Sequence, residues 1–278
     1  MFILYMNQLT LINGDCLIEM KKMADKSIDV IFCDLPYGIT DLKWDKLIDL
    51  DEFWKEVMRI KKLHTPIIMT CTTKFGVSLI NSAPKKCPFR YDLIWCKSAS
   101  VGFLRSKKAP MRKHEMIYLF YEREPFYDIS SHKHKFLDKK DTKTSKEGAY
   151  GKGIQIKQPK VMGSRYDPPL PDSLVKEGGS DGNITEEYEA IYGTLKPADY
   201  IPNSLLEIKS TKGKHSTEKP VQLMEWILKY YSKVDDVIFD PTMGSGSMGV
   251  ACKNMNRKFI GIEMDEEIFK VAEGRLAD

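Results

Sequence analysis

A glycine-rich turn near the C-terminal end of the 278-residue chain sets the strongest limit on its fold. The apolar run Val237-Ile238-Phe239 leads into Asp240-Pro241-Thr242-Met243-Gly244-Ser245-Gly246-Ser247-Met248-Gly249, which has the spacing GxGxxG and opens a helix-like segment. The next apolar run ends at Glu263, about 20 residues beyond the first glycine, where an acid can accept hydrogen bonds from ribose hydroxyls. The segment therefore predicts a site for a nucleoside-containing cofactor.

Apolar stretches rich in Val, Ile and Phe recur along the chain with helix-like stretches between them, which is typical of an α/β sheet. Helices are expected over 51–62 and 221–231, where apolar side chains recur at helical spacing. The first residues, Phe2 to Met6, are too few for a signal peptide or a membrane span and predict a strand. The other expected strands are 10–12, 29–33, 66–71, 91–96, 116–121, 236–239 and 259–262.

The glycine turn follows most of the expected strands instead of preceding them. A dinucleotide-binding domain of the usual order begins with such a turn. Here the other strands have to come from upstream, so we expect a Rossmann-like sheet of about seven strands in circularly permuted order. The two halves of the chain then fold together and bring Asp34 next to the Gly244 turn.

Asp34 belongs to a second motif, Asp34-Leu35-Pro36-Tyr37, which directly follows the apolar strand at 29–33. Ligands in open α/β sheets bind beyond the carboxyl ends of strands, so these residues are well placed for chemistry. Pro36 favours an extended backbone at Leu35 and thereby fixes the direction of the Leu35 carbonyl. The turn offers a carboxylate, a rigid carbonyl and an aromatic ring.

These groups suit an exocyclic amine of a nucleic acid base. Such an amine is a poor nucleophile until its N–H bonds are held by acceptors, and Asp34 and the Leu35 carbonyl can supply two. Tyr37 can stack on a base that has swung out of the duplex. An ordinary strand-to-loop turn is the competing interpretation of any single four-residue match.

The composition excludes several other classes of protein. Hydrophobic residues make up 42% of the chain, enough for one large core or a core with a smaller lobe. The six cysteines contain no CxxC pair, so neither a zinc site nor a disulfide framework is indicated, and no metal is expected. We therefore expect a soluble cytoplasmic protein without a membrane partner.

Basic residues cluster from Lys97 to His114, a stretch without a single acid, and again from Lys133 to Lys146. A polyanionic partner explains both runs, although a solvated lysine-rich surface does so as well. The candidate nucleic-acid-binding residues of the first run are Lys97, Arg105, Lys107, Lys108, Arg112 and Lys113.

In their order along the chain these segments resemble the β-class amino-methyltransferases of DNA. In that family an Asp-Pro-Pro-Tyr turn precedes a variable recognition region and the cofactor motif comes last. The resemblance implies a methyltransferase sheet, S-adenosylmethionine as the cofactor and a flipped base in double-stranded DNA as the target. Leu35 departs from the first Pro of the pattern and Thr242-Met243 from a Phe-containing pair, but neither change removes a group that the chemistry needs.

Several segments carry the resemblance. Asn13-Gly14-Asp15-Cys16 resembles the segment near the cofactor's adenine, and His215-Ser216-Thr217-Glu218-Lys219-Pro220 resembles His-x-Thr-x-Lys-Pro, which holds the methionine end. Trp44-Asp45 and Lys113-His114-Glu115 also have counterparts in the family. The cofactor-binding residues that the resemblance implies are Asp15, Cys16, His215, Ser216, Thr217, Lys219, Asp240, Pro241, Thr242, Gly244, Ser245, Gly246 and Glu263.

From about residue 122 to 205 the pattern of strands and helices gives way to Lys, Ser, Gly and Pro. A structureless loop of this length is unusual in a compact domain, so the segment predicts an inserted lobe or a region that orders on a partner. The expected organisation is a catalytic half at 1–121, a target-recognition region at 122–205 and a cofactor-binding half at 206–278.

The expected function is site-specific methylation of adenine N6 in DNA, because an Asp-led turn is common among adenine enzymes that look like this one. The alternatives are methylation of cytosine N4, of RNA or of protein glutamine, a dinucleotide-binding oxidoreductase, and a DNA-binding module that has lost turnover. A homodimer and a cognate restriction enzyme are further expectations. The recognition sequence is not readable from the chain.

Overall fold

The structure is a computed structural model that describes residues 3–6, 8–38, 46–103, 106–128, 205–210 and 218–277, with four short strands elsewhere. The chain divides into two compact units, one of residues 1–128 with 204–278 and the other of residues 129–203. The second unit contains two antiparallel strand pairs. These strands are β7 (Lys135–Phe136), β8 (Thr142–Thr144), β9 (Lys157–Pro159) and β10 (Tyr166–Asp167).

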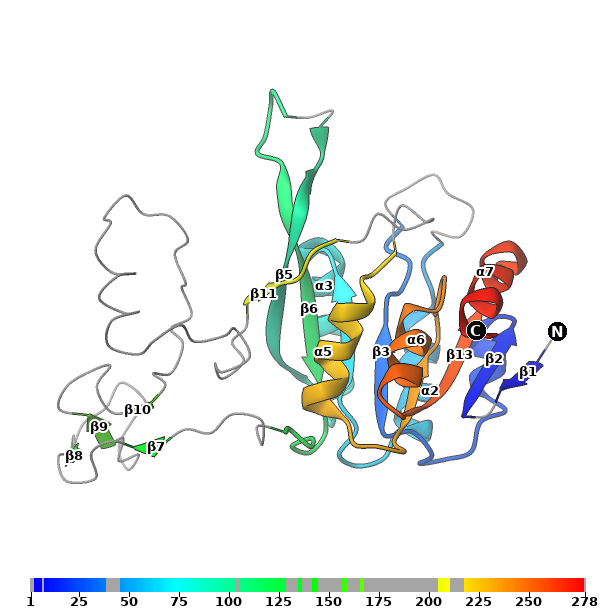
Figure 1. The fold of residues 1–278 in the computed structure, drawn as a ribbon, viewed down its shortest axis with the longest axis horizontal. Coiled ribbons are helices and arrows are strands. Elements are labelled where there is room, and N and C mark those ends of the chain that lie inside the picture. The colour runs from blue at the N-terminus through cyan, green and yellow to red at the C-terminus, as the bar shows by residue number, and fades with distance from the viewer. Residues whose placement is uncertain are drawn as a thin grey trace. The chain divides into compact units, whose positions relative to one another are not determined.

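The first unit is built on one nine-stranded sheet (Figure 1). From edge to edge its strands are β1 (Ile3–Met6), β2 (Leu9–Asn13), β13 (Lys258–Glu263), β12 (Val237–Asp240), β3 (Val30–Cys33), β4 (Ile67–Cys71), β6 (Arg112–Phe120), β5 (Phe89–Val101) and β11 (Leu205–Glu207). The expected strands are all present, including the one predicted for the first residues. The sheet is wider than the expected seven strands because β1 and β11 extend its two edges.

Strands β2, β13, β12, β3 and β4 run parallel to one another, and β6 is antiparallel to both β4 and β5. The C-terminal strands β12 and β13 therefore lie between β2 and β3, which come early in the chain. This interleaving places the turns after β3, β12 and β13 at neighbouring positions along the end of the sheet where the parallel strands terminate. Circular permutation is a relation to other proteins, and it stays a prediction.

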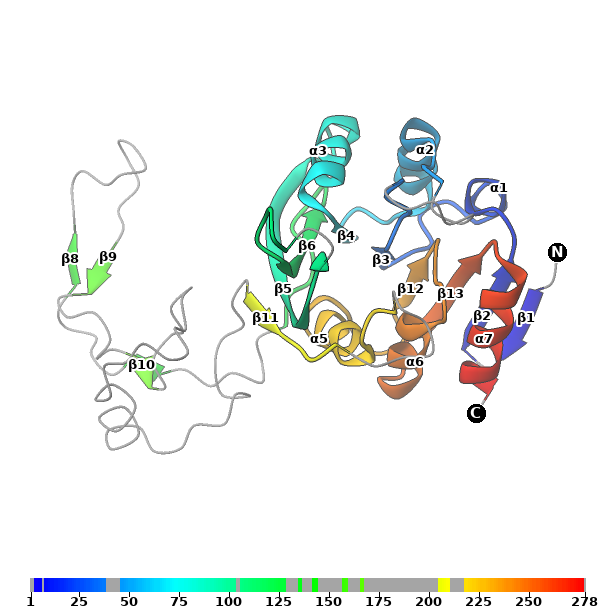
Figure 2. The ribbon, with the colours of Figure 1, turned by 90° about the horizontal axis from the view of Figure 1, so that it is seen from above.

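Helices cover both faces of the sheet (Figure 2). One layer contains α1 (Cys16–Met20), α2 (Leu50–Ile60) and α3 (Thr73–Ser82), and the other contains α5 (Val221–Tyr231), α6 (Ser247–Asn254) and α7 (Glu266–Ala277). Both predicted helices are present as α2 and α5. Helix α2 begins at Leu50 because the Asp49 side chain caps it by accepting from the N–H groups of Asp51 and Glu52.

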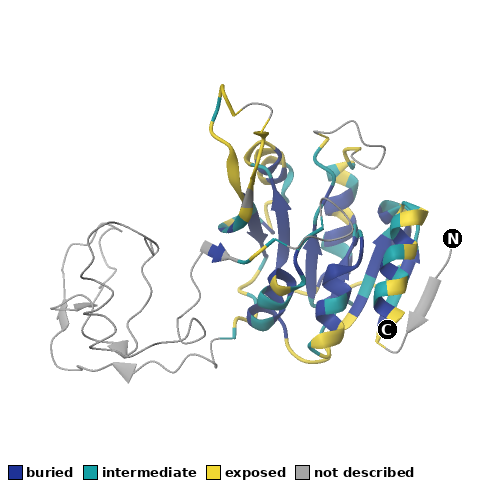
Figure 3. Ribbon diagram, turned by 45° about the horizontal axis from the view of Figure 1, so that its top comes forward, coloured by how far each residue is buried: buried dark blue, intermediate teal, exposed yellow. Residues whose placement is uncertain are grey.

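The core lies on both faces of the central strands (Figure 3). All residues of β3 are buried, and they alternate between the two layers because successive side chains of a strand point to opposite faces. Val30 and Phe32 pack in the cluster that contains α5, α6 and α7, whereas Ile31 and Cys33 pack with α1, α2 and α3. A strand buried on both faces fixes the position of whatever follows it, here Asp34.

Strands β5 and β6 form a long hairpin that extends beyond the rest of the sheet (Figure 1). Because β6 is antiparallel to both of its neighbours, β5 runs in the same direction as β4. Strand β5 therefore terminates at the same end of the sheet as the parallel strands. The hairpin therefore leaves the sheet at the end where the turns after β3, β12 and β13 lie.

Within the described residues, no helix is both long and apolar enough to cross a membrane.

Candidate active site

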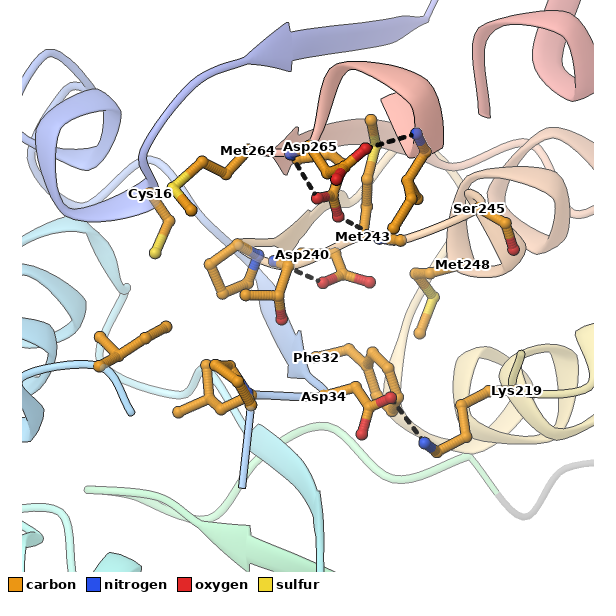
Figure 4. Close-up of a pocket in the computed structure, with 18 of the residues that line it drawn as sticks. Cys16, Phe32, Asp34, Lys219, Asp240, Met243, Ser245, Met248, Met264 and Asp265 are labelled. Atoms are coloured by element: carbon orange, nitrogen blue, oxygen red, sulfur yellow. Dashed lines mark hydrogen bonds and ion pairs between the residues drawn. The ribbon is translucent and has the colours of Figure 1, made fainter. Parts of the chain in front are cut away.

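A cavity of about 910 Å³ opens at the carboxyl ends of the central strands (Figure 4). It joins the turn after β3 to the glycine-rich loop after β12, as the interleaved strand order requires. Gly246 belongs to this loop but does not line the cavity, and His215, Ser216 and Thr217 lie outside the described residues. The sequence-predicted residues in the lining are Asp15, Cys16, Asp34, Leu35, Pro36, Tyr37, Lys97, Lys219, Asp240, Pro241, Thr242, Gly244, Ser245 and Glu263.

The glycine-rich loop depends on glycine for two separate reasons. Gly246 is the N-cap of α6 and adopts φ +82°, a left-handed conformation that side chains with a Cβ resist. Gly249 lies where a Cβ would come within 2.8 Å of Leu276 and 2.9 Å of Phe259, so only glycine lets α6 pack this closely on α7 and β13. These two glycines thus fix the course of the loop at the start of α6.

Arg275 of α7 fastens this loop to the segment before α5. Its guanidinium donates to the carbonyl oxygen of Ser245 at 2.8 Å and to the Ser245 hydroxyl at 2.9 Å, and it forms an ion pair with Glu218 at 2.9 Å. Glu218 immediately precedes Lys219, so the contact helps to set the position of that lysine. Arg275 was not among the predicted site residues, because α7 follows the motif and carries no signal of its own.

Glu263 is held at the end of β13 by the backbone on both sides. Its Oε2 accepts from the Gly244 N–H at 3.1 Å and its Oε1 from the Asp265 N–H at 2.8 Å. Burial raises the pKa of Glu263, and these backbone donors oppose that rise. The carboxylate keeps free lone pairs and lines the cavity, as a group that accepts from ribose hydroxyls must.

Asp240, at the end of β12, is 3% exposed and accepts a hydrogen bond from the Thr242 N–H at 3.1 Å. Burial raises its pKa well above the usual value. The Thr242 hydroxyl is also buried, and it has no hydrogen-bond partner within the described part of the chain. A buried carboxylate and an unsatisfied hydroxyl in one wall are the acceptors and donors that the ammonium, carboxylate and hydroxyl groups of S-adenosylmethionine require, so the cavity fits this cofactor.

Asp15 and Cys16 also line the cavity, beside the end of β13. Asp15 caps α1 by accepting from the Leu17 N–H at 2.8 Å. The Gly14 N–H donates to the Glu263 carbonyl oxygen at 3.0 Å, which holds this segment against the ribose-binding candidate. Cys16 is buried, and burial raises the pKa of its thiol to about 12, so it forms a neutral, apolar part of the wall.

Asp34 meets donors from three parts of the chain. The Lys219 ammonium lies 2.6 Å from Oδ2, and the two point toward each other in Figure 4. Oδ1 accepts from the Tyr37 hydroxyl at 2.8 Å and from the Thr70 hydroxyl at 2.5 Å. Lys219 was expected at the methionine end of the cofactor, but the structure places it on the Asp34 carboxylate.

Glu115 of β6 completes this group of charges. It is 9% exposed and pairs with Lys219 at 3.1 Å and with Lys97 at 2.5 Å. Burial opposes its ionisation, but the two ammonium groups outweigh burial and lower the pKa of Glu115. We call Asp34, Glu115, Lys97 and Lys219 the ionic cluster.

Glu115 and Thr70 were not among the predicted site residues. The sequence did carry one signal for Glu115, its position in Lys113-His114-Glu115, which has a counterpart in the family. Thr70 carried none, because it lies inside a buried strand and reaches Asp34 only through the pairing of β4 with β3.

The structure places the residues of the basic run in two different environments. Lys97 was expected on a nucleic-acid-binding surface, yet it lies over the Trp95 ring at 5.1 Å and is neutralised by Glu115, so it belongs to the ionic cluster. Arg105 and the pair Trp44-Asp45 lie outside the described residues. The exposed members of the run, all on the β5–β6 hairpin, are Lys107, Lys108, Arg112 and Lys113.

Tyr37 is tied to this cluster through its hydroxyl, which also lies 3.1 Å from Glu115 Oε1. Burial, followed by the Asp34 and Glu115 charges, raises its pKa well above the usual value, so the phenol is neutral. Its ring packs on Phe75 with a centroid distance of 5.3 Å. Stacking of Tyr37 on a base stays a prediction.

Known proteins share both sequence and fold with this chain. The DNA adenine methyltransferase YhdJ of Escherichia coli (strain K12) is 28% identical over 96% of this chain and 82% of its own length. The type II methyltransferase M2.LlaDCHI of Lactococcus lactis subsp. cremoris is 47% identical, but over only 23% of this chain and 24% of its own length.

Two solved structures show that the fold is shared. M1.HpyAVI in complex with SAM matches with a TM-score of 0.57 and 19% identity, over 96% of this chain and all of that one. The cytosine-N4-specific PvuII DNA methyltransferase matches with a TM-score of 0.61 and 14% identity, over 97% of this chain and 86% of that one. A family model described as DNA methylase matches residues 28–274. Because that match takes in both the Asp34 turn and the glycine-rich loop, this chain belongs to the DNA methylase family.

Proposed function

We propose that this chain transfers a methyl group from S-adenosylmethionine to adenine N6 in double-stranded DNA. The observation that carries the proposal is the single cavity shared by the Asp34 turn and the glycine-rich loop, which come from opposite ends of the chain. Membership of the DNA methylase family replaces the oxidoreductase alternative.

The loop end of the cavity holds the cofactor in this proposal. Asp240 receives the ammonium group, Glu263 accepts from the ribose hydroxyls and Thr242 satisfies its hydroxyl on a polar group of the ligand. S-adenosylmethionine supplies a methyl group on a sulfonium, which is already activated toward nucleophiles. The protein therefore contributes mainly positioning and a matched electrostatic environment.

The other end of the cavity orients the amine. Asp34 Oδ1 already accepts from Tyr37 and Thr70, whereas Oδ2 accepts from Lys219 alone among the described residues. A carboxylate oxygen offers two lone pairs, so Oδ2 keeps one for an N–H of the base. The Leu35 carbonyl accepts the second N–H, which directs the amine's lone pair at the methyl group. The new N–C bond would form as the S–C bond breaks, the thioether S-adenosylhomocysteine would leave with the electron pair, and the proton lost by the nitrogen would pass to solvent.

Lys219 acts on Asp34 in this scheme. Burial opposes its charge, but Asp34 and Glu115 outweigh burial and raise its pKa, so the ammonium form is retained. A permanent cation at 2.6 Å keeps Asp34 an acceptor and fixes its rotamer. A contact of Lys219 with the methionine end of the cofactor stays a prediction, since Lys219 also lines the cavity.

Several finer points belong to the same proposal. Adenine is favoured over cytosine because YhdJ, which aligns with nearly the whole chain, is named an adenine enzyme. The region 122–205 reads the target sequence, and the target base is flipped into the cavity. A cytoplasmic location, a homodimer and a cognate restriction enzyme are the remaining expectations.

The test is to express the chain in cells that lack DNA methylation and to sequence the methylated bases of their DNA. N6-methyladenine at one short sequence motif is the expected result. Methyl groups on cytosine N4 would change the base, and methyl groups confined to RNA or to protein glutamine would overturn the assignment to DNA. Purified protein with tritiated S-adenosylmethionine and duplex DNA gives the same answer in vitro.

A further inference from the structure

Within the described residues, the outer end of the β5–β6 hairpin carries three large apolar side chains that are exposed. Phe103 is 79% exposed, Val101 49% and Met111 42%, and Phe103 is the most exposed of the large apolar side chains in the described residues. Single exposed apolar residues are ordinary on protein surfaces. An aromatic ring flanked by two aliphatic side chains on a projecting hairpin is a surface that suits an apolar partner.

This surface is continuous with the active site. Lys97 and Val101 of β5 line the cavity, and Lys97 is anchored to Glu115 inside it. Gly102 follows with φ +95°, a conformation that turns the chain directly after the cavity wall. Phe103 therefore lies just outside the cavity, on an element whose base is fixed by the ionic cluster.

The charges on the hairpin identify the partner. No acid occurs between Val101 and His114, while Lys107, Lys108, Arg112 and Lys113 are all exposed. A positively charged hairpin with an apolar end is complementary to a duplex, which has phosphates outside and stacked apolar bases inside. A protein partner would have to be strongly acidic as well as apolar.

We propose that Phe103 enters the base stack of the duplex and occupies the space that the target base leaves when it turns into the cavity. The inference rests on the proposed function and adds to it the group that stabilises the flipped state. Unstacking a base is costly, and an aromatic ring in the vacated position recovers part of the lost stacking. The lysines and arginine hold the flanking phosphates, and Val101 and Met111 widen the wedge.

The test compares two duplexes with the same target sequence, found by sequencing methylated DNA. In one the target base is normally paired and stacked; in the other it lies in a short bubble of mismatched bases, so that it is already unpaired and largely unstacked. On the paired duplex, Phe103→Ala is expected to lower kcat by about ten- to hundred-fold, the range of one lost aromatic stack. On the duplex with the bubble the variant should work within about two-fold of the wild type.

Two further variants make the comparison specific. Phe103→Trp keeps a stacking ring and should retain most of the activity on both duplexes. Val234→Ala removes an exposed apolar side chain at the amino end of β12, on the opposite edge of the sheet, and should behave as wild type. Fluorescence of 2-aminopurine at the target position should rise when the wild type binds and rise less with Phe103→Ala.

Equal loss by Phe103→Ala on both duplexes would assign Phe103 to the structure of the site, and no loss on either would leave it without a role in flipping. Either result overturns the proposal. A wild-type protein that methylates neither duplex contradicts the proposed function itself, so the two failures are distinguishable.

Discussion

The carboxylates at the two ends of the cavity have different partners. At the Asp34 end, Asp34 and Glu115 face two lysines at 2.5–3.1 Å, and the charges balance within the protein. At the loop end, the donors to Asp240 and Glu263 within the described residues are backbone N–H groups, and burial raises the pKa of both carboxyl groups. The charges of the first end are balanced without a ligand, whereas we expect the second end to be completed by a ligand that brings a cation and hydroxyls.

The largest effect is expected at the Asp34 end. Asp34→Ala should lower methyl transfer by about a thousand-fold, because the amine loses a charged acceptor in a partly buried site. Binding of S-adenosylmethionine should persist, since its candidate contacts lie at the other end. A tritiated-methyl assay and calorimetry measure the two quantities. Turnover close to that of the wild type would remove Asp34 from the mechanism.

Glu115→Gln tests whether the ionic cluster is a balanced unit. The change leaves Lys97 and Lys219 with one carboxylate between them, so the free energy of unfolding should fall by about 3 kcal/mol at pH 7. The Glu115 pKa is lowered by folding, so its stabilising effect is present above the usual glutamate value of 4.5 and is lost as pH falls through the lowered value. The wild type and the variant should therefore converge in acid.

Urea unfolding at a series of pH values measures this convergence. Glu267→Gln is the matched control, because Glu267 pairs with Lys270 at 3.4 Å on an exposed surface and should change stability by less than about 1 kcal/mol. A Glu115→Gln protein as stable as this control would mean that the cluster is not balanced by Glu115.

Asp240→Asn should raise the stability of the ligand-free protein, whereas Glu115→Gln should lower stability. Folding raises the Asp240 pKa, so its stabilising effect is fully present below the unfolded value and is lost as pH rises through the folded value. Removing the charge should therefore raise the Tm of the ligand-free protein at pH 8 by about 2–4 °C, and by less in acid.

The same variant should bind S-adenosylmethionine about ten-fold more weakly, because the ammonium loses its ionic partner. Thermal unfolding without ligand and calorimetry with ligand separate the two effects. A variant that is destabilised without ligand would show that the Asp240 charge is already balanced within the protein. A variant that binds the cofactor normally would show that Asp240 does not hold the ammonium group.

The smallest effect is expected from the exposed lysines of the β5–β6 hairpin. Lys107→Ala with Lys108→Ala should weaken DNA binding several-fold and reduce the slope of log K against log salt by about 2, without a change in stability. The matched control is Lys85→Ala with Lys86→Ala, an exposed pair at the other end of β5. Equal salt slopes for the two double variants would remove the hairpin from the DNA surface.

Much of the fold was predictable from local sequence. The strands and the two helices α2 and α5 were found because their apolar patterns are long and regular. The edge strands β1 and β11 differ in this respect. The first was expected from a short apolar run, but β11 has only three residues and exists through its pairing with β5.

The sequence by itself determined the chemistry available to this protein, because the carboxylate after β3, the glycine spacing and the acid after β13 are local properties of the chain. Only the tertiary structure decided which groups meet. Lys219 reaches Asp34 across 185 residues, and Lys97 turns from a surface cation into a partner of Glu115. Ion pairs form between side chains that pairing and packing of distant strands bring together, and local sequence carries no record of that geometry.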